Sequence, residues 1–202
     1  MTDPASGGGG GGGMTMRNLV VTENITLDGV IDASEGWFTP SGDDGDNDTA
    51  DMAQVQQEHM NDADAVLLGR VTYEQFQGYW PLQTDDTTGI SDYLNRTDKY
   101  VVSATLPAPT WQNTTVLDGP LAEEVATLKE RPGKAIVATG SVSLVQALLP
   151  TGLVDEYRLF VYPVVLGRGR RLFEDATDLG ALRLVAARPF SSGVVLMRCR
   201  AA

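Results

Sequence analysis

The segment Leu67-Leu-Gly-Arg-Val-Thr-Tyr-Glu74 runs from an apolar strand pattern through a glycine into a helix pattern. The run before the glycine is typical of a strand buried in a parallel sheet, and we expect the helix over residues 71–78. Free N–H groups at a helix start favour phosphate, and an arginine adds a charged donor. Gly69 and Arg70 therefore indicate a phosphate-binding turn, although a plain strand-to-helix turn has the same pattern.

Two later segments repeat this arrangement. In Val101-Val-Ser-Ala-Thr105, small hydroxyl residues follow a strand, where they either hold a ribose phosphate or cap a turn. In Val137-Ala-Thr-Gly-Ser-Val-Ser143, a strand again runs through a glycine into a helix. The carboxyl ends of parallel strands lie at one edge of a sheet, so we expect the three turns to line one crevice. None contains the G-x-G-x-x-G fingerprint, so a Rossmann fold is not predicted.

Strands and helices alternate along the rest of the chain. We expect strands at 17–27, 114–117, 135–139 and 155–166, helices at 49–62, 91–96, from 120 and from 141, and a closing strand pair at 182–188 and 193–200. This order predicts an α/β protein with a mostly parallel sheet, helices on both faces and an antiparallel edge at the C-terminal end.

The length of 202 residues suggests one domain and a tail. Residues 1–15 include seven consecutive glycines, Gly7 to Gly13, which predict a flexible coil of either native or added origin. We place the folded domain at residues 16–202.

The net charge of −12 argues against nucleic-acid binding, because an acidic chain repels phosphate backbones. A dinucleotide is not excluded, since it needs only a few local donors. The one cysteine, Cys199, cannot form an internal disulfide, which fits a reducing cytoplasm. No apolar run reaches membrane-spanning length and no secretory signal is recognised. We therefore expect a cytoplasmic protein that does not bind membranes.

Taken in order, these motifs resemble those of the dihydrofolate reductases over roughly residues 17–200. Gly69-Arg-Val-Thr-Tyr-Glu74 is similar to their G-R-x-T-x-E/S turn, Thr49-Ala-Asp-Met-Ala53 to the start of their substrate-side helix, and Thr139-Gly-Ser-Val with Leu148-Leu-Pro150 to their third cofactor turn and its helix. Gly152-Leu-Val-Asp-Glu-Tyr157, Pro163-Val-Val-Leu-Gly167 and Leu172-Phe173 resemble the reductase domain of riboflavin biosynthesis.

The resemblance implies a dihydrofolate-reductase-like three-layer α/β fold with about eight strands, NADPH as the cofactor and a homodimer. The cofactor residues that it implies are Gly69, Arg70 and Thr72, then Ser103 and Thr105, then Gly140, Ser141, Val142 and Ser143, and, near the nicotinamide, Asn24 and Ile31. The apolar run Leu159 to Leu166 adds a reason to expect the dimer, because such a strand would leave hydrophobic surface to cover.

The chain departs from both families at defined positions. Gly140-Ser141 stands where dihydrofolate reductases usually have a glycine pair. Riboflavin reductases carry a lysine six residues before the aspartate of S-L-D-G. Here the aspartate is Asp28, in Thr-Leu-Asp-Gly, and the earlier residue is Thr22. Their G-T-V-L-x-D-D-P stretch is missing as well. These departures concern the substrate more than the cofactor.

Two aspartates are candidates for the acid of a reductase. Hydride transfer to a C=N bond needs a proton, which a pocket carboxyl or a water ordered by one supplies. Asp51 matches the pocket acid by resemblance, although an aspartate at a helix start is also favoured by the helix dipole. Asp28 is the other candidate, although Asp-Gly is first of all a turn signal.

We expect no metal site. The lone histidine, His59, has no ligand cluster around it and is expected to pack on a helix face. The run Asp44-Gly-Asp46-Asn-Asp48 resembles a calcium loop but has Thr49 instead of glycine at its sixth position and Val55 instead of glutamate at its twelfth. Nearby, Trp37-Phe38 either cover a planar substrate ring or fill the core.

The resulting expectation is an NADPH-dependent reductase of a small heterocyclic substrate that is pterin-like or pyrimidine-like. One alternative is the 5-amino-6-(5-phosphoribosylamino)uracil reductase of riboflavin biosynthesis. Another, of a different class, is a catalytically silent module that binds NADPH.

Overall fold

An eight-stranded sheet runs through the molecule in the order β4-β3-β2-β5-β1-β6-β8-β7. The computed structural model describes residues 16–38, 50–174 and 179–201. The strands are β1 (Leu19–Thr26), β2 (Ala63–Gly69), β3 (Asp98–Val102), β4 (Thr114–Leu117), β5 (Ala135–Thr139), β6 (Glu156–Tyr162), β7 (Leu182–Pro189) and β8 (Val195–Ala201). The first six pair in parallel, and β8 and then β7 add an antiparallel edge, which confirms the predicted sheet.

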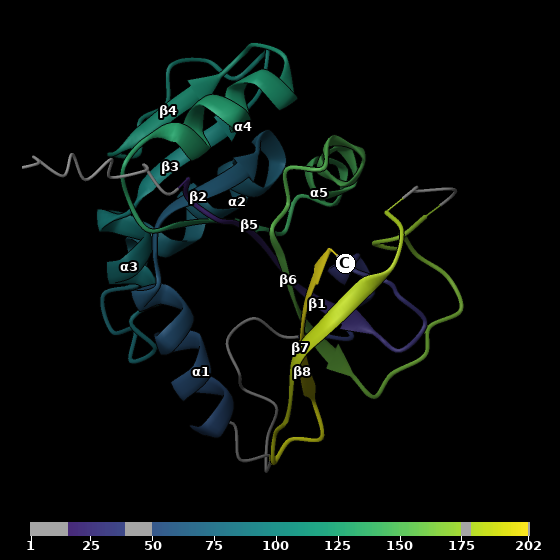
Figure 1. The fold of residues 1–202 in the computed structure, drawn as a ribbon. Coiled ribbons are helices and arrows are strands. Elements are labelled where there is room, and N and C mark those ends of the chain that lie inside the picture. Colours follow the sequence, from purple (N-terminus) through teal and green to yellow (C-terminus); the bar gives the residue numbers. More distant parts are fainter. Residues whose placement is uncertain (1–15, 39–49, 175–178, 202) are drawn as a thin grey trace, which may run out of the picture.

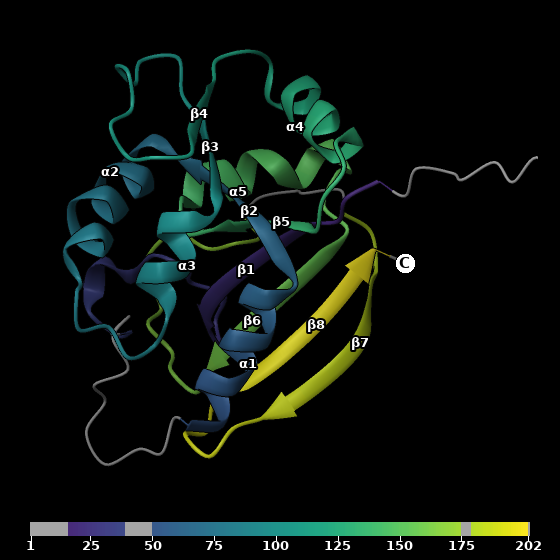
Figure 2. The same ribbon diagram turned by 90° about the vertical axis from the view of Figure 1, so that its left-hand side faces the viewer.

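Helices cover both faces of the sheet (Figures 1 and 2). They are α1 (Ala50–Asn61), α2 (Arg70–Tyr79), α3 (Ile90–Arg96), α4 (Leu121–Glu130) and α5 (Val142–Leu148), with short 3-10 turns η1 (Ala33–Glu35), η2 (Trp80–Leu82) and η3 (Leu149–Thr151). Among the described residues, none of these helices is long and apolar enough to cross a bilayer. The expected tail at 1–15 and the calcium-like run from Asp44 to Asp48 lie outside the described residues.

The two-residue period of the strands assigns each side chain to one helical layer. In β2, Leu67 packs in the cluster that contains α4 and α5, whereas Leu68 packs with side chains of α2 and α3. In β6, Leu159 belongs to the first cluster and Phe160 to a third one, with Met52 of α1. Strands buried on both faces explain why these segments read as continuous apolar runs. The predicted three-layer α/β architecture is confirmed.

The chain leaves β1 and β5 in opposite directions. After β1 it passes through α1 to β2, whereas after β5 it passes through α5, on the other face, to β6. Because β1 and β5 are neighbours in the sheet, their carboxyl ends diverge and leave a crevice between them. In open α/β sheets, such a switch point is where ligands bind. The topology therefore places the expected site at the carboxyl ends of β1 and β5.

The predicted strand 155–166 is too long, because β6 ends at Tyr162. Pro163 has no N–H to continue the ladder, and the N–H groups of Leu166 and Gly167 are donated to the Asp28 carboxylate instead, at 3.3 and 2.8 Å. The residues of β6 are buried except for the half-buried Val161, whereas Val165 of the same apolar run lies beyond the strand and is 69% exposed. The strand itself leaves little hydrophobic surface to cover, and the homodimer stays a prediction.

A buried ion cluster holds the antiparallel edge to the parallel sheet. The carboxylate of Glu156 on β6 accepts hydrogen bonds from Arg158 on the same strand and from Arg198 and Arg200 on β8. Burial alone raises the pKa of Glu156, but the bonds from these three guanidinium groups outweigh it and lower the pKa to about 2. The side chain of Glu156 is only 3% exposed, so its loss would leave buried arginine charge without a partner.

We predict that Glu156→Gln lowers the free energy of unfolding by about 3–5 kcal/mol, because it breaks a buried ion pair. The native pKa is below the ordinary value of 4.5, so this contribution is complete above pH 4.5 and is lost as the pH falls towards 2. Denaturant unfolding of both proteins between pH 7 and about pH 2 measures the difference. Glu130→Gln, at an exposed position, is the control. The prediction is contradicted if the difference in the free energy of unfolding between wild type and Glu156→Gln stays the same at acidic pH.

Candidate functional site

The hydroxyl of Ser141 joins two of the three predicted cofactor turns. Its Oγ accepts the N–H of Gly69, at the start of α2, at 2.8 Å, and donates to Oγ1 of Thr72 at 2.6 Å. Ser141 itself lies just before α5, with φ of 50° and ψ of 62°. This left-handed conformation is costly for a residue with a Cβ, so surrounding contacts have to hold it. The turns after β2 and β5 thus form one rigid unit.

Glycine is required where the two turns touch. A Cβ on Gly69 would lie 3.0 Å from Oγ of Ser141, and a Cβ on Gly140 would lie 3.0 Å from Cγ2 of Thr72. Gly140 also has φ of 63°, which residues with side chains rarely adopt. The absence of a Cβ at both positions therefore lets the turns after β2 and β5 pack against each other.

The third predicted turn follows β3, the neighbour of β2 in the sheet. Oγ of Ser103 accepts the N–H groups of Thr105 and Leu106 at 3.1 and 2.9 Å, so this serine caps its own turn. Thr105 is exposed. Arg70 is also exposed and pairs with Glu74 one helical turn later at 3.0 Å. Exposed pairs of this kind are worth little, so the guanidinium group is free to turn to an anion.

The first strand and its loop form the other side of the crevice. Asn24 is partly exposed near the end of β1, and the nearly buried Ile31 donates its N–H to the carbonyl of Arg170 at 3.0 Å. Trp37 and Phe38 pack edge-on against Tyr162 at the end of β6, with ring centroids 5.4 and 5.6 Å away. Two roles were expected for these aromatic rings, and the structure shows them packed on the core.

Asp28 accepts hydrogen bonds both from its own turn and from the loop that follows β6. Its carboxylate accepts the hydroxyl of Thr26 at 2.6 Å as well as the N–H groups of Leu166 and Gly167. The Thr26 hydroxyl and the Gly167 N–H are the main reasons that the pKa of Asp28 falls to about 2. Asp28 therefore orders the loop between β6 and β7, and little of its carboxylate is left for a ligand.

Asp51 lies in the first turn of α1. Helices that connect parallel strands run antiparallel to them, so the start of α1 lies at the same edge of the sheet as the three turns. Oδ2 of Asp51 accepts the N–H and the hydroxyl of Ser191, at 2.9 and 3.0 Å, and these bonds lower its pKa. Oδ1 is enclosed and, among the described residues, has no hydrogen-bond partner. One oxygen thus fixes the side chain while the other is unused.

Glu23 is an acid that the sequence analysis did not single out. It is 6% exposed in β1, its Oε1 has no partner among the described residues, and burial raises its pKa well above the usual range, offset only in part by a hydrogen bond from the Gly140 backbone. The signal available in the sequence was a glutamate inside a strand of β-branched and apolar residues, Leu19–Thr26. His59, by contrast, packs on Phe160 as expected, and burial lowers its pKa to about 4.

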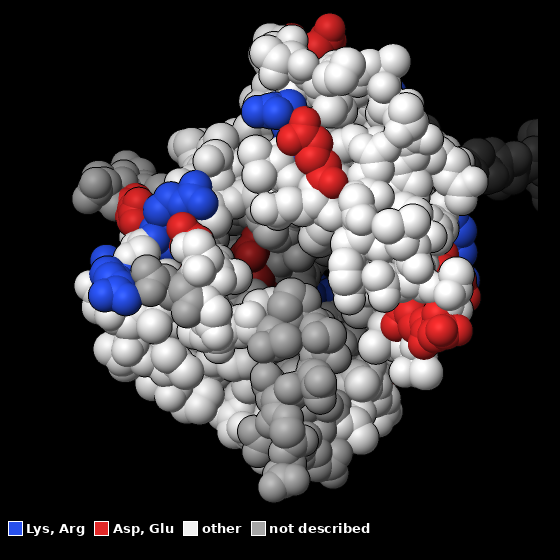
Figure 3. Space-filling view, turned by 180° about the vertical axis from the view of Figure 1, so that it is seen from behind, with Lys and Arg blue, Asp and Glu red and all other residues white. Residues whose placement is uncertain are grey.

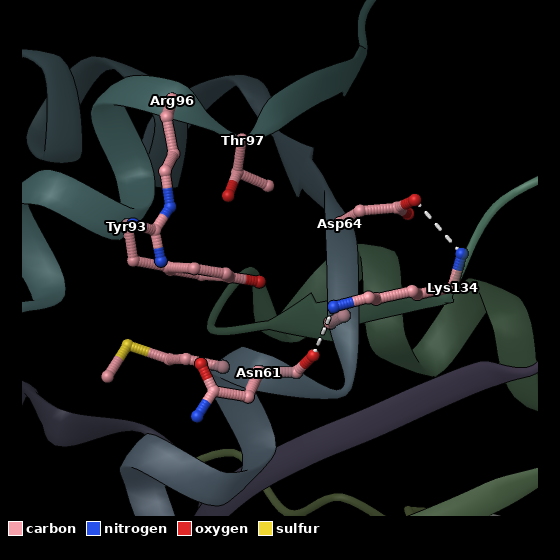
Figure 4. A pocket seen from close by; sticks show the side chains of 8 residues that line it. Asn61, Asp64, Tyr93, Arg96, Thr97 and Lys134 are labelled. Carbon is pink, nitrogen blue, oxygen red and sulfur yellow. Dashed lines mark hydrogen bonds between the residues drawn. The ribbon is translucent and has the colours of Figure 1, made fainter.

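The face of the molecule seen from behind in Figure 3 is hollowed, with an acidic group deep inside the hollow and charged pairs at its rim. A separate cavity of about 300 Å³ lies at the amino end of β2, where the Asp64 carboxylate accepts the backbone N–H of Lys134 and the Lys134 ammonium group donates to the Asn61 carbonyl (Figure 4). That cavity is at the opposite edge of the sheet from the three turns, so it is no part of the site that they form.

Residues 17–196 match the model of the RibD C-terminal domain. The chain belongs to this family. It is 35% identical over 187 residues to YyaP of Bacillus subtilis (strain 168), an uncharacterised protein, with 90% of this chain and 94% of YyaP covered. The predicted relation to the reductase domain of riboflavin biosynthesis is thereby confirmed at the level of the family.

Two solved structures confirm the fold. A pyrimidine reductase-like protein of Corynebacterium diphtheriae superposes with a TM-score of 0.61 at 18% identity, covering 92% of each chain. Dihydrofolate reductase of Enterococcus faecalis, solved with NADP(H), superposes with a TM-score of 0.59 at 16% identity, covering 91% of this chain and 95% of that one. The RibD-type domain described here therefore has the dihydrofolate-reductase-like fold that its motifs predicted.

We predict that Ser141→Ala lowers the free energy of unfolding by about 1–3 kcal/mol, because the half-buried N–H of Gly69 loses its acceptor. Ser143→Ala is the matched control, since this serine is exposed in the first turn of α5, two residues after Ser141. Denaturant unfolding of the three proteins measures the effect. Equal midpoints for the two alanine variants would show that the hydroxyl of Ser141 does not hold the turns together.

Proposed function

We propose that this RibD-type domain is an NADPH-dependent reductase that transfers a hydride to a small heterocyclic substrate, pterin-like or pyrimidine-like. The observation that carries the proposal is the joint at Ser141, which brings two glycine turns together beside the β1–β5 crevice. Family membership supports it, because the chain belongs to the RibD C-terminal domain family and its motifs resemble those of the reductase domain of riboflavin biosynthesis. We further propose that the domain at 16–202 acts as a homodimer in the cytoplasm.

The residues present fit a dinucleotide. Gly69 and Gly140 let the turns after β2 and β5 pack together, and each turn leads into a helix start, so the pair of turns would form a cradle for the pyrophosphate. Thr72, Ser141, Val142 and Ser143 surround that cradle, and Ser103, Thr105 and Arg70 lie at its β3 end, where they would hold the additional phosphate of NADPH. Asn24 and Ile31 would border the nicotinamide. A bound NADPH supplies the hydride, and the protein's own groups orient it and exclude water.

The proton that accompanies hydride transfer would be supplied from the side of the crevice where the substrate binds. Asp51 is ionised, because the Ser191 bonds lower its pKa, so its carboxylate would hold a ring N–H or a water rather than release a proton of its own. Its unused Oδ1 is the atom for that contact. Asp28 is the second candidate, although its carboxylate already has four donors: the Thr26 hydroxyl, the N–H groups of Leu166 and Gly167, and the Arg171 guanidinium group.

Two alternatives follow from specific observations. Family membership favours the pyrimidine reductase of riboflavin biosynthesis, although Thr22 stands at the position of that family's lysine. The occupied hydroxyl of Ser103 and the saturated Asp28 favour a catalytically silent NADPH-binding module. A titration with NADPH and NADH, followed by a screen of pterins and pyrimidines for NADPH oxidation, separates the three. Binding without turnover of any ring would select the silent module.

We predict that NADPH binds more tightly than NADH, because Arg70 and the Ser103 turn lie where the extra phosphate would be held. Arg70→Met should remove most of this preference, with a loss of about tenfold or more in NADPH affinity, since hydrogen bonds to charged groups contribute about 1.5–3 kcal/mol. Fluorescence titration measures both affinities. Arg183→Met, on the distant edge strand β7, is the control. Equal affinities for the two dinucleotides in the unaltered protein would contradict the prediction.

We predict that Asp51→Asn lowers turnover by about 10²–10⁴-fold while it leaves NADPH affinity nearly unchanged, because Asp51 faces the substrate rather than the phosphate turns. Asp62→Asn, exposed just past the end of α1, is the control. Steady-state kinetics with the best substrate of the screen measures the effect. If turnover is unchanged, Asp51 serves the helix start alone, and Asp28→Asn becomes the variant to compare.

A further inference from the structure

Glu23 lies where the β1–β5 crevice opens. The last residue pair between these strands is Thr22 with Thr139, and beyond it Gly140 turns the chain away, so Glu23 is the first residue of β1 without a β5 neighbour. On its other side it still pairs with Leu159 of β6. Glu23 therefore borders the switch point at which a ligand of this fold is expected.

The surroundings of this carboxyl group are apolar. Its same-face neighbours on β1, Val21 and Ile25, and its partner Leu159 all belong to the cluster with α4 and α5, and they are 0%, 5% and 7% exposed. Glu156, the other buried glutamate, has three arginines to balance it, whereas no cation pairs with Glu23 among the described residues. A buried carboxylate without a cation is strongly disfavoured, so the neutral acid is the stable form.

A neutral carboxylic acid is both an acceptor and a donor. The Gly140 backbone lowers the pKa of Glu23 in part, so this carboxyl group lies beside the cofactor turn after β5. Oε1 is enclosed and has no hydrogen-bond partner among the described residues. Leaving a buried polar group unpaired costs about 1–3 kcal/mol, so a partner supplied by a ligand would relieve a penalty that the free protein carries.

We propose that Glu23 is held as a neutral carboxylic acid and donates a hydrogen bond to the carboxamide oxygen of the nicotinamide ring. This inference rests on the proposed NADPH-dependent function and names a further cofactor contact for it. The carboxamide is favoured over a substrate carbonyl, because Glu23 faces the α5 layer beside Gly140, whereas Asp51 belongs to α1 on the opposite face. A neutral donor suits a neutral amide, since no charge has to be buried when they meet.

The test is calorimetric titration of the unaltered protein, Glu23→Gln and Glu23→Met with NADP⁺ and with its thionicotinamide analogue, whose sulfur is a weaker acceptor. Met removes the donor and keeps the volume, so affinity for NADP⁺ should fall about tenfold. Gln keeps a neutral donor and should stay within about threefold of the unaltered protein. In the unaltered protein, the analogue should bind less tightly than NADP⁺. In Glu23→Met, which has no donor, the analogue and NADP⁺ should bind with equal affinity.

Two results overturn this inference and leave the proposed function standing. One is that Glu23→Met binds NADP⁺ as tightly as the unaltered protein does. The other is that the affinity falls by the same factor from NADP⁺ to the thio analogue in the unaltered protein and in Glu23→Met. Failure of the unaltered protein to bind NADP⁺ or NADPH overturns both. Thermal unfolding checks that each variant is folded. If Glu23→Met does not fold, the unaltered protein decides alone, because equal affinity for NADP⁺ and the thio analogue then rejects the carboxamide contact.

Discussion

The contact between the Ser141 hydroxyl and the turn at Gly69 is the constraint on which the candidate site depends. Two strands that are neighbours in the sheet, β2 and β5, end at the same edge, and their following turns come so close that a Cβ at Gly69 or Gly140 would lie 3.0 Å from a side chain of the other turn. The hydroxyl fills the remaining space and satisfies an N–H at the start of α2 that the helix itself leaves unpaired. The left-handed backbone at Ser141 is the cost of this arrangement.

Two buried glutamates illustrate how the same side chain takes opposite roles. Glu156, surrounded by guanidinium groups of β6 and β8, stays charged and binds the antiparallel edge to the parallel sheet. Glu23 lies on the neighbouring strand among apolar side chains, which favour the neutral acid. Its Oε1 has no hydrogen-bond partner among the described residues. Burial is nearly the same for both, so the presence of cations decides which protonation state the fold stabilises.

The aspartates differ in what their surroundings leave unused. The carboxylate of Asp28 is consumed by Thr26 and by two backbone N–H groups, and it thereby ends β6 and shapes the loop that follows. Asp51 is held through one oxygen by Ser191, from the turn between β7 and β8, and its other oxygen has no hydrogen-bond partner within the described part of the chain. The antiparallel edge thus orients a side chain of α1, which links the C-terminal strands to the proposed substrate side of the crevice.

The sequence by itself determined the alternation of strands and helices, the closing antiparallel pair and the three glycine or hydroxyl turns, because side-chain period and turn chemistry are local properties. It also placed the turn residues Gly69 and Gly140 at one edge. Tertiary structure alone decided that Ser141 bridges to Gly69, that Asp28 accepts the backbone N–H of Leu166 and so shortens β6, and that no cation among the described residues pairs with Glu23. The first two outcomes depend on hydrogen bonds between residues 72 or more positions apart, and the third depends on which side chains surround a buried group. A local sequence pattern does not show either kind of neighbour.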